Sequence, residues 1–129
     1  MLVRRIAVAL CLCLGAAGPG LADGDAGAGK AVFRKCAPCH TATEPVAKVG
    51  PSLMGIVGRP VATFPGYSYS EAMTAFGADG KVWDEALLSD YLLSPKAMVP
   101  GTRMTFAGLK KPQDIADIIA YLKDPAAVQ

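Results

Sequence analysis

The sequence contains few of the residues that metal and thiol sites require. It has a single histidine, His40, and only four cysteines, of which Cys11 and Cys13 lie in an N-terminal segment that we expect to be removed. The rest of the chain therefore offers too few Cys and His ligands for a four-coordinate zinc site. Regular alternation of apolar and polar residues is also lacking apart from short runs such as 61–64, which argues against a sheet with one buried face.

An excess of charge of either sign is lacking as well. The chain carries 13 basic and 11 acidic residues. Two of the basic residues, Arg4 and Arg5, belong to the N-terminal segment, and without them the remaining chain is formally neutral. Net charge therefore gives no support for binding to nucleic acid or to an anionic membrane surface.

The first 22 residues are typical of a secretory signal peptide. Two arginines precede an apolar run at 6–14, and Gly20-Leu21-Ala22 supplies small residues, Gly20 and Ala22, at the cleavage positions. The alternative is an uncleaved anchor, but the apolar run is shorter than the about 20 residues of a spanning helix and is followed by glycine and proline. We predict a signal peptide at 1–22, one domain at 23–129, and a periplasmic protein without stable membrane insertion after cleavage.

The apolar residues of this domain recur with helical spacing, and no repeat or composition shift marks a second domain. The strongest helix is expected from Pro112 to just before Pro125, and another is expected to begin with Asp84 as its N-cap. Gly29 is expected to allow close contact between the first and last helices, where Tyr121 would pack. The fold class is therefore all-α, with predicted helices at 25–35, 70–76 and 84–93 and from Pro112 onward.

Residues 41–65 are rich in glycine and proline, so no long regular element is expected there. A loop of this length inside a small domain usually has a function. The pair Ser94-Pro95 is expected to stop the preceding helix.

The run Cys36-Ala37-Pro38-Cys39-His40 carries the chemistry. Its two thiols can add to the two vinyl groups of a haem, and the adjacent imidazole reaches the iron. A thioredoxin-like thiol pair is expected beside a βαβ pattern, which this chain lacks, and a structural disulfide would leave His40 unexplained. The motif predicts one covalent haem c, attached through Cys36 and Cys39 and coordinated by His40.

A sixth iron ligand must come from another residue type, because the chain has no second histidine. A thioether is suitable and raises the reduction potential relative to a second imidazole. Met54, Met73, Met98 and Met104 follow the signal peptide, and any methionine is more often a filler of core space than a ligand. Met104 is the first candidate because it lies in a non-helical segment, 100–106, between two helices, and Met98 is the second.

These residues resemble the class I c-type cytochromes, in particular the branch that holds mitochondrial cytochrome c and the bacterial periplasmic cytochromes c of the c2 type. The resemblance covers nearly all of the mature chain. The chain has about three more residues than the mitochondrial pattern between Tyr69 and Trp83, and one residue fewer before Cys36. The matching segments, in family order, are 35–41, 50–53, 55–59, 65–70, Trp83, 91–92 and 100–108.

The resemblance implies the class I cytochrome c fold, in which helices wrap around one covalently bound haem. It implies that Met104 is the distal ligand and that the Pro51 carbonyl accepts the second ring N–H of His40. It further implies that Arg59, Tyr69 and Trp83 meet the buried haem propionate and that Tyr91 lies near the Met104 sulfur.

In function, the resemblance implies a soluble one-electron carrier of respiration or photosynthesis, a monomer and not an enzyme. Its expected partners are redox complexes such as a cytochrome bc1-type reductase and a terminal oxidase or reaction centre. A haem peroxidase or a gas-binding sensor with an open distal site is the alternative, and a carrier dedicated to one dehydrogenase also remains open. Six cations are expected to ring the exposed haem edge, unless they are ordinary solvated residues: Lys35, Lys48, Lys96, Arg103, Lys110 and Lys111.

Overall fold

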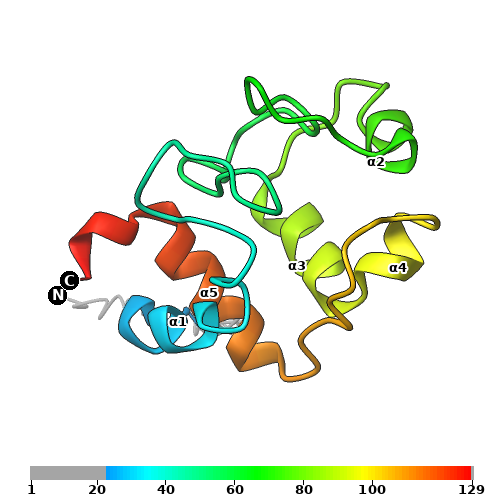
Figure 1. The fold of residues 1–129 in the computed structure, drawn as a ribbon. Coiled ribbons are helices and arrows are strands. Elements are labelled where there is room, and N and C mark those ends of the chain that lie inside the picture. The colour runs from blue at the N-terminus through cyan, green and yellow to red at the C-terminus, as the bar shows by residue number, and fades with distance from the viewer. Residues whose placement is uncertain (1–22, 129) are drawn as a thin grey trace, which may run out of the picture.

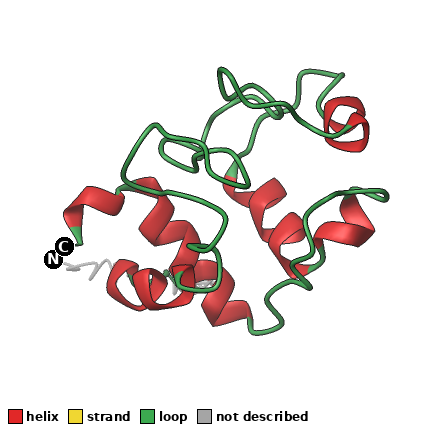
Figure 2. Ribbon diagram, in the orientation of Figure 1, coloured by secondary structure: helices red, strands yellow, loops and turns green. Residues whose placement is uncertain are grey.

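Helices and long connecting loops make up the described chain in the computed structural model, which describes residues 23–128 (Figures 1 and 2). Within these residues the sole β-type pairing is an isolated bridge between Pro60 and Val82, so the all-α expectation is confirmed. The predicted signal peptide lies outside the described residues. The elements are α1 (Ala26–Phe33), α2 (Glu71–Phe76), α3 (Glu85–Leu93), α4 (Pro95–Met98), α5 (Pro112–Lys123) and a 3-10 turn, η1 (Pro125–Ala127).

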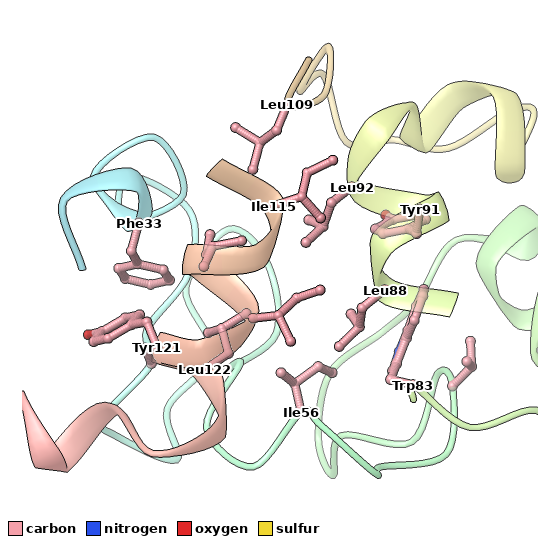
Figure 3. Close-up of a cluster of buried hydrophobic side chains, with 14 of the residues drawn as sticks. Phe33, Ile56, Trp83, Leu88, Tyr91, Leu92, Leu109, Ile115, Tyr121 and Leu122 are labelled. Atoms are coloured by element: carbon pink, nitrogen blue, oxygen red, sulfur yellow. The ribbon is translucent and has the colours of Figure 1, made fainter. Parts of the chain in front are cut away.

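Helices α1 and α5 lie against each other although they come from opposite ends of the domain (Figure 1). Gly29 makes this possible, because a Cβ at that position would lie 2.6 Å from the carbonyl carbon of Asp117 and 2.7 Å from Cβ of Tyr121. The ring of Phe33 faces that of Tyr121, with 5.5 Å between centroids (Figure 3). The close contact predicted at Gly29 is confirmed.

A buried carboxylate joins the start of α1 to the middle of α5. Asp117 is only 6% exposed, and its Oδ1 accepts hydrogen bonds from the backbone N–H of Asp25 and from Nε2 of Gln113, both at 2.8 Å. Asp25 is itself the N-cap of α1 and accepts from the N–H of Ala28 at 2.6 Å. The polar group is buried at low cost because it is hydrogen-bonded.

Helix α3 begins as the sequence predicts, since Oδ1 of Asp84 accepts from the N–H of Leu87 at 2.8 Å. It ends at Leu93, before Pro95, again as expected. The sequence analysis did not predict that Pro95 would open a further short helix, α4. Proline suits the first turn of a helix, where its missing N–H is not needed, and Pro125 opens η1 in the same way.

The hydrophobic core lies between α3, α5 and the loops that face them (Figure 3). Ile118 of α5 is fully buried, and Leu88 and Leu92 extend the same cluster from α3. The long loop contributes Ile56 and Val61. Among the described helices, none is both long and apolar enough to cross a membrane.

Candidate haem site

A cavity of about 590 Å³ opens between the long loop, α2, α3 and the segment that precedes α5. Its lining is largely apolar and includes Leu53, Ile56 and Leu92. The structure brings together at this cavity the nine residues that the sequence analysis expected at the haem: Cys36, Cys39, His40, Pro51, Arg59, Tyr69, Trp83, Tyr91 and Met104.

The cysteine motif follows directly on α1 and turns the chain back toward the cavity. The backbone carbonyl of Cys36 accepts from the N–H groups of Cys39 at 3.1 Å and of His40 at 3.0 Å. Both thiols are partly exposed and are not joined in a disulfide. Burial raises the pKa of the Cys36 thiol to about 11, an effect that the neighbouring Lys35 partly opposes.

The imidazole of His40 is held by backbone groups. Its Nδ1 lies 2.7 Å from the carbonyl oxygen of Pro51. Gly50 packs on the ring so closely that a Cβ there would lie 2.8 Å from Nδ1 and 2.9 Å from Nε2. Burial lowers the pKa of His40, against the opposing effect of the Pro51 hydrogen bond, and Lys48 lowers it further. A neutral ring that donates from Nδ1 has Nε2 available for a metal.

The structure separates the four methionines. Met54 is 46% exposed and Met98 lies in α4, and neither lines the cavity. Met104 does line it, from the non-helical segment between α4 and α5, and its backbone N–H donates to Oγ1 of Thr102 at 3.2 Å. Met73 of α2 also lines the cavity.

Polar groups gather at another part of the cavity wall. The guanidinium of Arg59 donates to the carbonyls of Ser52 at 2.8 Å and Met54 at 3.2 Å. Burial lowers the pKa of Arg59, while Tyr69 acts in the opposite direction. The hydroxyl of Tyr69 accepts from the N–H of Phe64 at 2.9 Å.

Two buried aromatic residues continue this wall. Trp83 is 5% and Tyr91 is 8% exposed, and their ring centroids are 4.8 Å apart (Figure 3). Burial raises the pKa of Tyr91 to about 12, so its hydroxyl stays protonated at neutral pH. Neither the Trp83 indole nor the Tyr91 hydroxyl has a recorded side-chain hydrogen bond to another residue of 23–128, so both can serve a bound group.

The cavity lining also includes residues that the sequence analysis did not name as site residues, and four of them contribute to the argument: Gly50, Tyr67, Met73 and Thr102. Three of them lie inside the segments that carry the family resemblance, and that position was the available signal. Met73 falls in the stretch between Tyr69 and Trp83 that has extra residues. No local pattern distinguishes it from a core methionine.

A profile of the cytochrome c family matches residues 26–125. The chain belongs to the cytochrome c family. It is 51% identical over 106 residues to cytochrome c of Gossypium barbadense, covering 81% of this chain and 93% of that protein. It is 44% identical over 101 residues to cytochrome c2 of Agrobacterium tumefaciens (strain II Chrys), covering 78% and 91%.

A solved structure supports the same fold. Cytochrome cH from Methylobacterium extorquens superposes with a TM-score of 0.70 at 42% identity, covering 78% of this chain and 98% of that chain. The predicted class I cytochrome c fold is therefore confirmed. Cytochromes c are electron carriers with a covalent c-type haem and exchange electrons with redox partners, so the predictions of family and cofactor are confirmed as well.

The cavity fits such a cofactor. Its volume lies within the range of about 300–1,000 Å³ typical of sites for small molecules and cofactors, and such sites combine an apolar lining with a few placed polar groups. Here a neutral imidazole, two unpaired thiols and a thioether meet at one apolar cavity, together with donors from Arg59 and Trp83.

Proposed function

We propose that this protein is an exported, periplasmic one-electron carrier, with residues 1–22 as its signal peptide and 23–129 as the mature cytochrome domain. The observation that carries the proposal is the meeting of His40, oriented by Pro51, and Met104 at one cavity beside the paired thiols. A haem held in this way supplies an iron that takes up and gives back one electron without changing its ligands.

The cysteine motif attaches the haem and positions His40. Cys36 and Cys39 tether the porphyrin covalently, and the turn between them keeps His40 next to the attachment points. The Pro51 carbonyl accepts a hydrogen bond from Nδ1–H of His40, which fixes the tautomer that leaves Nε2 for the iron and strengthens the imidazole as a ligand. Gly50 packs against the ring at a place where a Cβ would overlap the imidazole, so the absence of a side chain there makes room for the ring.

Met104 would supply a second iron ligand from the cavity wall. With its thioether bound, the iron would leave no open position for dioxygen or peroxide. A peroxidase or gas-binding sensor needs that open position, and the presence of Met104 in the cavity wall favours the carrier. Thr102 supports this arrangement by accepting from the backbone N–H of Met104.

The polar wall receives the propionate groups. A carboxylate inside an apolar cavity needs charged or hydrogen-bonding partners to offset its desolvation. Arg59 has N–H groups beyond the two that it spends on backbone carbonyls. Tyr69 and Trp83 complete the set of polar groups proposed for the propionates. The Tyr91 hydroxyl is proposed to lie near the Met104 sulfur.

The partners we propose are membrane redox complexes, such as a cytochrome bc1-type reductase on one side and a terminal oxidase or reaction centre on the other. The protein would meet them as a monomer. All six cations named in the sequence analysis are exposed, and Lys35 and Arg103 lie at the cavity itself. Lys48 reaches the cysteine motif, where its Nζ donates to the carbonyl of Ala37 at 2.7 Å.

The decisive test combines mass spectrometry with the visible spectrum of protein purified from the periplasmic fraction. The mature chain is expected to begin at Asp23 and to carry the mass of one haem, and the oxidised protein should show the weak red-edge band of a thioether bound to ferric iron. Met104→Ala should abolish this band, whereas Met98→Ala and Met54→Ala should keep it. A band that survives Met104→Ala would show that another group is the distal ligand.

A further inference from the structure

Three loop segments that border the cavity lie far apart in the sequence: 41–50, 60–70 and 99–108. Two long-range hydrogen bonds join them. Nη2 of Arg103 donates to the carbonyl of Ser68 at 2.6 Å, and the hydroxyl of Tyr67 donates to the carbonyl of Val49 at 3.1 Å. The partners are separated by 35 and 18 residues in the sequence.

These two bonds, which we call the rim clasp, are arranged in series. The carbonyl of Ser68 accepts from Arg103 in segment 99–108, which we call the Met104 segment. Its neighbour Tyr67 donates to Val49 in segment 41–50, which follows His40. Arg103, Tyr67 and Val49 all line the cavity. The rim clasp therefore runs along the cavity from the neighbour of one proposed iron ligand to the loop that contains Pro51.

The Met104 segment has little else to hold it. Within the described chain, the recorded hydrogen bonds of residues 103–108 other than that of Arg103 are local, from Met104 to Thr102 and from Lys110 to Ala107. Met104 and Phe106 add partly buried apolar contacts to the core. A segment with few hydrogen bonds and partial burial is where a folded protein opens locally.

We infer that the rim clasp keeps the Met104 thioether on the iron, with Arg103 and Tyr67 as positioning residues. The inference rests on the proposed ligation by Met104. Releasing the Arg103–Ser68 bond lets the Met104 segment move away from the cavity and opens the distal side to an added ligand. Releasing the Tyr67–Val49 bond acts only through Ser68, so its effect is smaller and depends on Arg103.

Imidazole is the probe for this opening, because it binds ferric iron only after the thioether has left. The oxidised holoprotein is titrated with imidazole and the loss of the red-edge band is followed. Arg103→Gln should bind imidazole about fivefold more tightly than wild type, which corresponds to the loss of one ordinary hydrogen bond. Tyr67→Phe should give about a twofold effect. Because the bonds act in series, the double variant should match Arg103→Gln alone.

Lys110→Gln is the matched control. It removes a cation from the same stretch of chain, but Lys110 bonds only to the carbonyls of Leu93 and Ala107 and does not cross the cavity. Its imidazole affinity and that of wild type should agree.

The global unfolding midpoint in urea should be similar for Arg103→Gln and Lys110→Gln, which separates positioning from general loss of stability. The inference is wrong if Arg103→Gln binds imidazole with wild-type affinity. It is also wrong if the effects of Arg103→Gln and Tyr67→Phe multiply in the double variant. If wild type itself lacks the red-edge band, the proposed ligation is wrong instead.

Discussion

The imidazole of His40 is positioned by residues that contribute only backbone. Pro51 supplies a carbonyl at 2.7 Å from Nδ1, and Gly50 supplies the absence of a side chain. A backbone carbonyl has no rotamers, so its position is fixed by the chain and it holds the ring in one orientation. Burial lowers the pKa of His40 and favours the neutral ring. The carbonyl then keeps the proton of that neutral ring on Nδ1. The orientation of the His40 ring therefore depends on the path of the loop.

Gly50→Ala tests that dependence. The new Cβ would lie within 2.9 Å of both ring nitrogens, a separation that folded proteins do not tolerate, so the ring or the loop must shift. We expect a loss of about 1–3 kcal/mol in the free energy of unfolding and a lower yield of protein with attached haem.

Val49→Ala serves as its control, because it changes the neighbouring side chain, which is 74% exposed. A surface change of this kind is expected to stay within about 0.5 kcal/mol. Urea unfolding and the ratio of haem to protein measure both effects. Equal stability of the two variants would mean that the Gly50 contact is not restrictive.

At the level of the elements, local signals placed the helices well. The Asp84 cap and the apolar stripe of 115–122 predicted α3 and α5 because both signals are local and follow from helix geometry. Helix α4 was missed because Pro95 was interpreted only as a stop signal, although proline also suits a first turn. The contact between α1 and α5 was foreseen from Gly29, but its buried polar partner Asp117 was not. Nothing in the sequence marks which acidic residue of a helix turns inward.

The pairing of α1 with α5 can be tested with two glycines that lie two residues apart on one helix. Gly29→Ala places a Cβ against the backbone of Asp117 and should destabilise the fold by about 1–3 kcal/mol or more. At Gly27 a Cβ would meet only the flexible side chain of Asp25, at 3.2 Å. Gly27→Ala should therefore stabilise the protein by about 0.5–1 kcal/mol through higher helix propensity.

Thermal and urea unfolding of the holoprotein would measure both glycine variants. Opposite signs are expected for the two changes. A stabilising Gly29→Ala would show that α1 and α5 can separate at this point without cost.

For the whole molecule, the sequence indicated the residues of the site but not how the chain encloses them. The order of the motifs says nothing about the path of the loop after α1, since glycine and proline exclude regular structure without specifying an alternative. The preference for Met104 over Met98 as the iron ligand followed from the expected absence of helix around 100–106. The structure has no helix there and places Met98 in α4, while the ligation itself stays a prediction. Met73 entered the cavity wall only through the tertiary position of α2.

Charge is also a property of the whole molecule, and its position is predicted to matter more than its sum. Residues 23–129 are formally neutral, so any steering of partners by this part of the chain must come from cations near the cavity, such as Lys35. Lys35→Glu and Lys30→Glu change the net charge equally, but Lys30 lies on α1 and does not line the cavity. If position decides, Lys35→Glu should slow reduction of a small anionic oxidant, hexacyanoferrate(III), severalfold at low salt, while Lys30→Glu has a smaller effect.

Stopped-flow rates as a function of ionic strength separate the two explanations. Near 1 M salt the screening length falls to about 3 Å, so the three proteins should converge on one rate if the difference is electrostatic. A difference that persists at high salt would instead mean that Lys35→Glu disturbs the haem site. Equal slowing by Lys30→Glu and Lys35→Glu would mean that net charge governs the encounter. The field of a single charge decays within about 10 Å at 0.1 M salt, so a local effect would differ between the two positions.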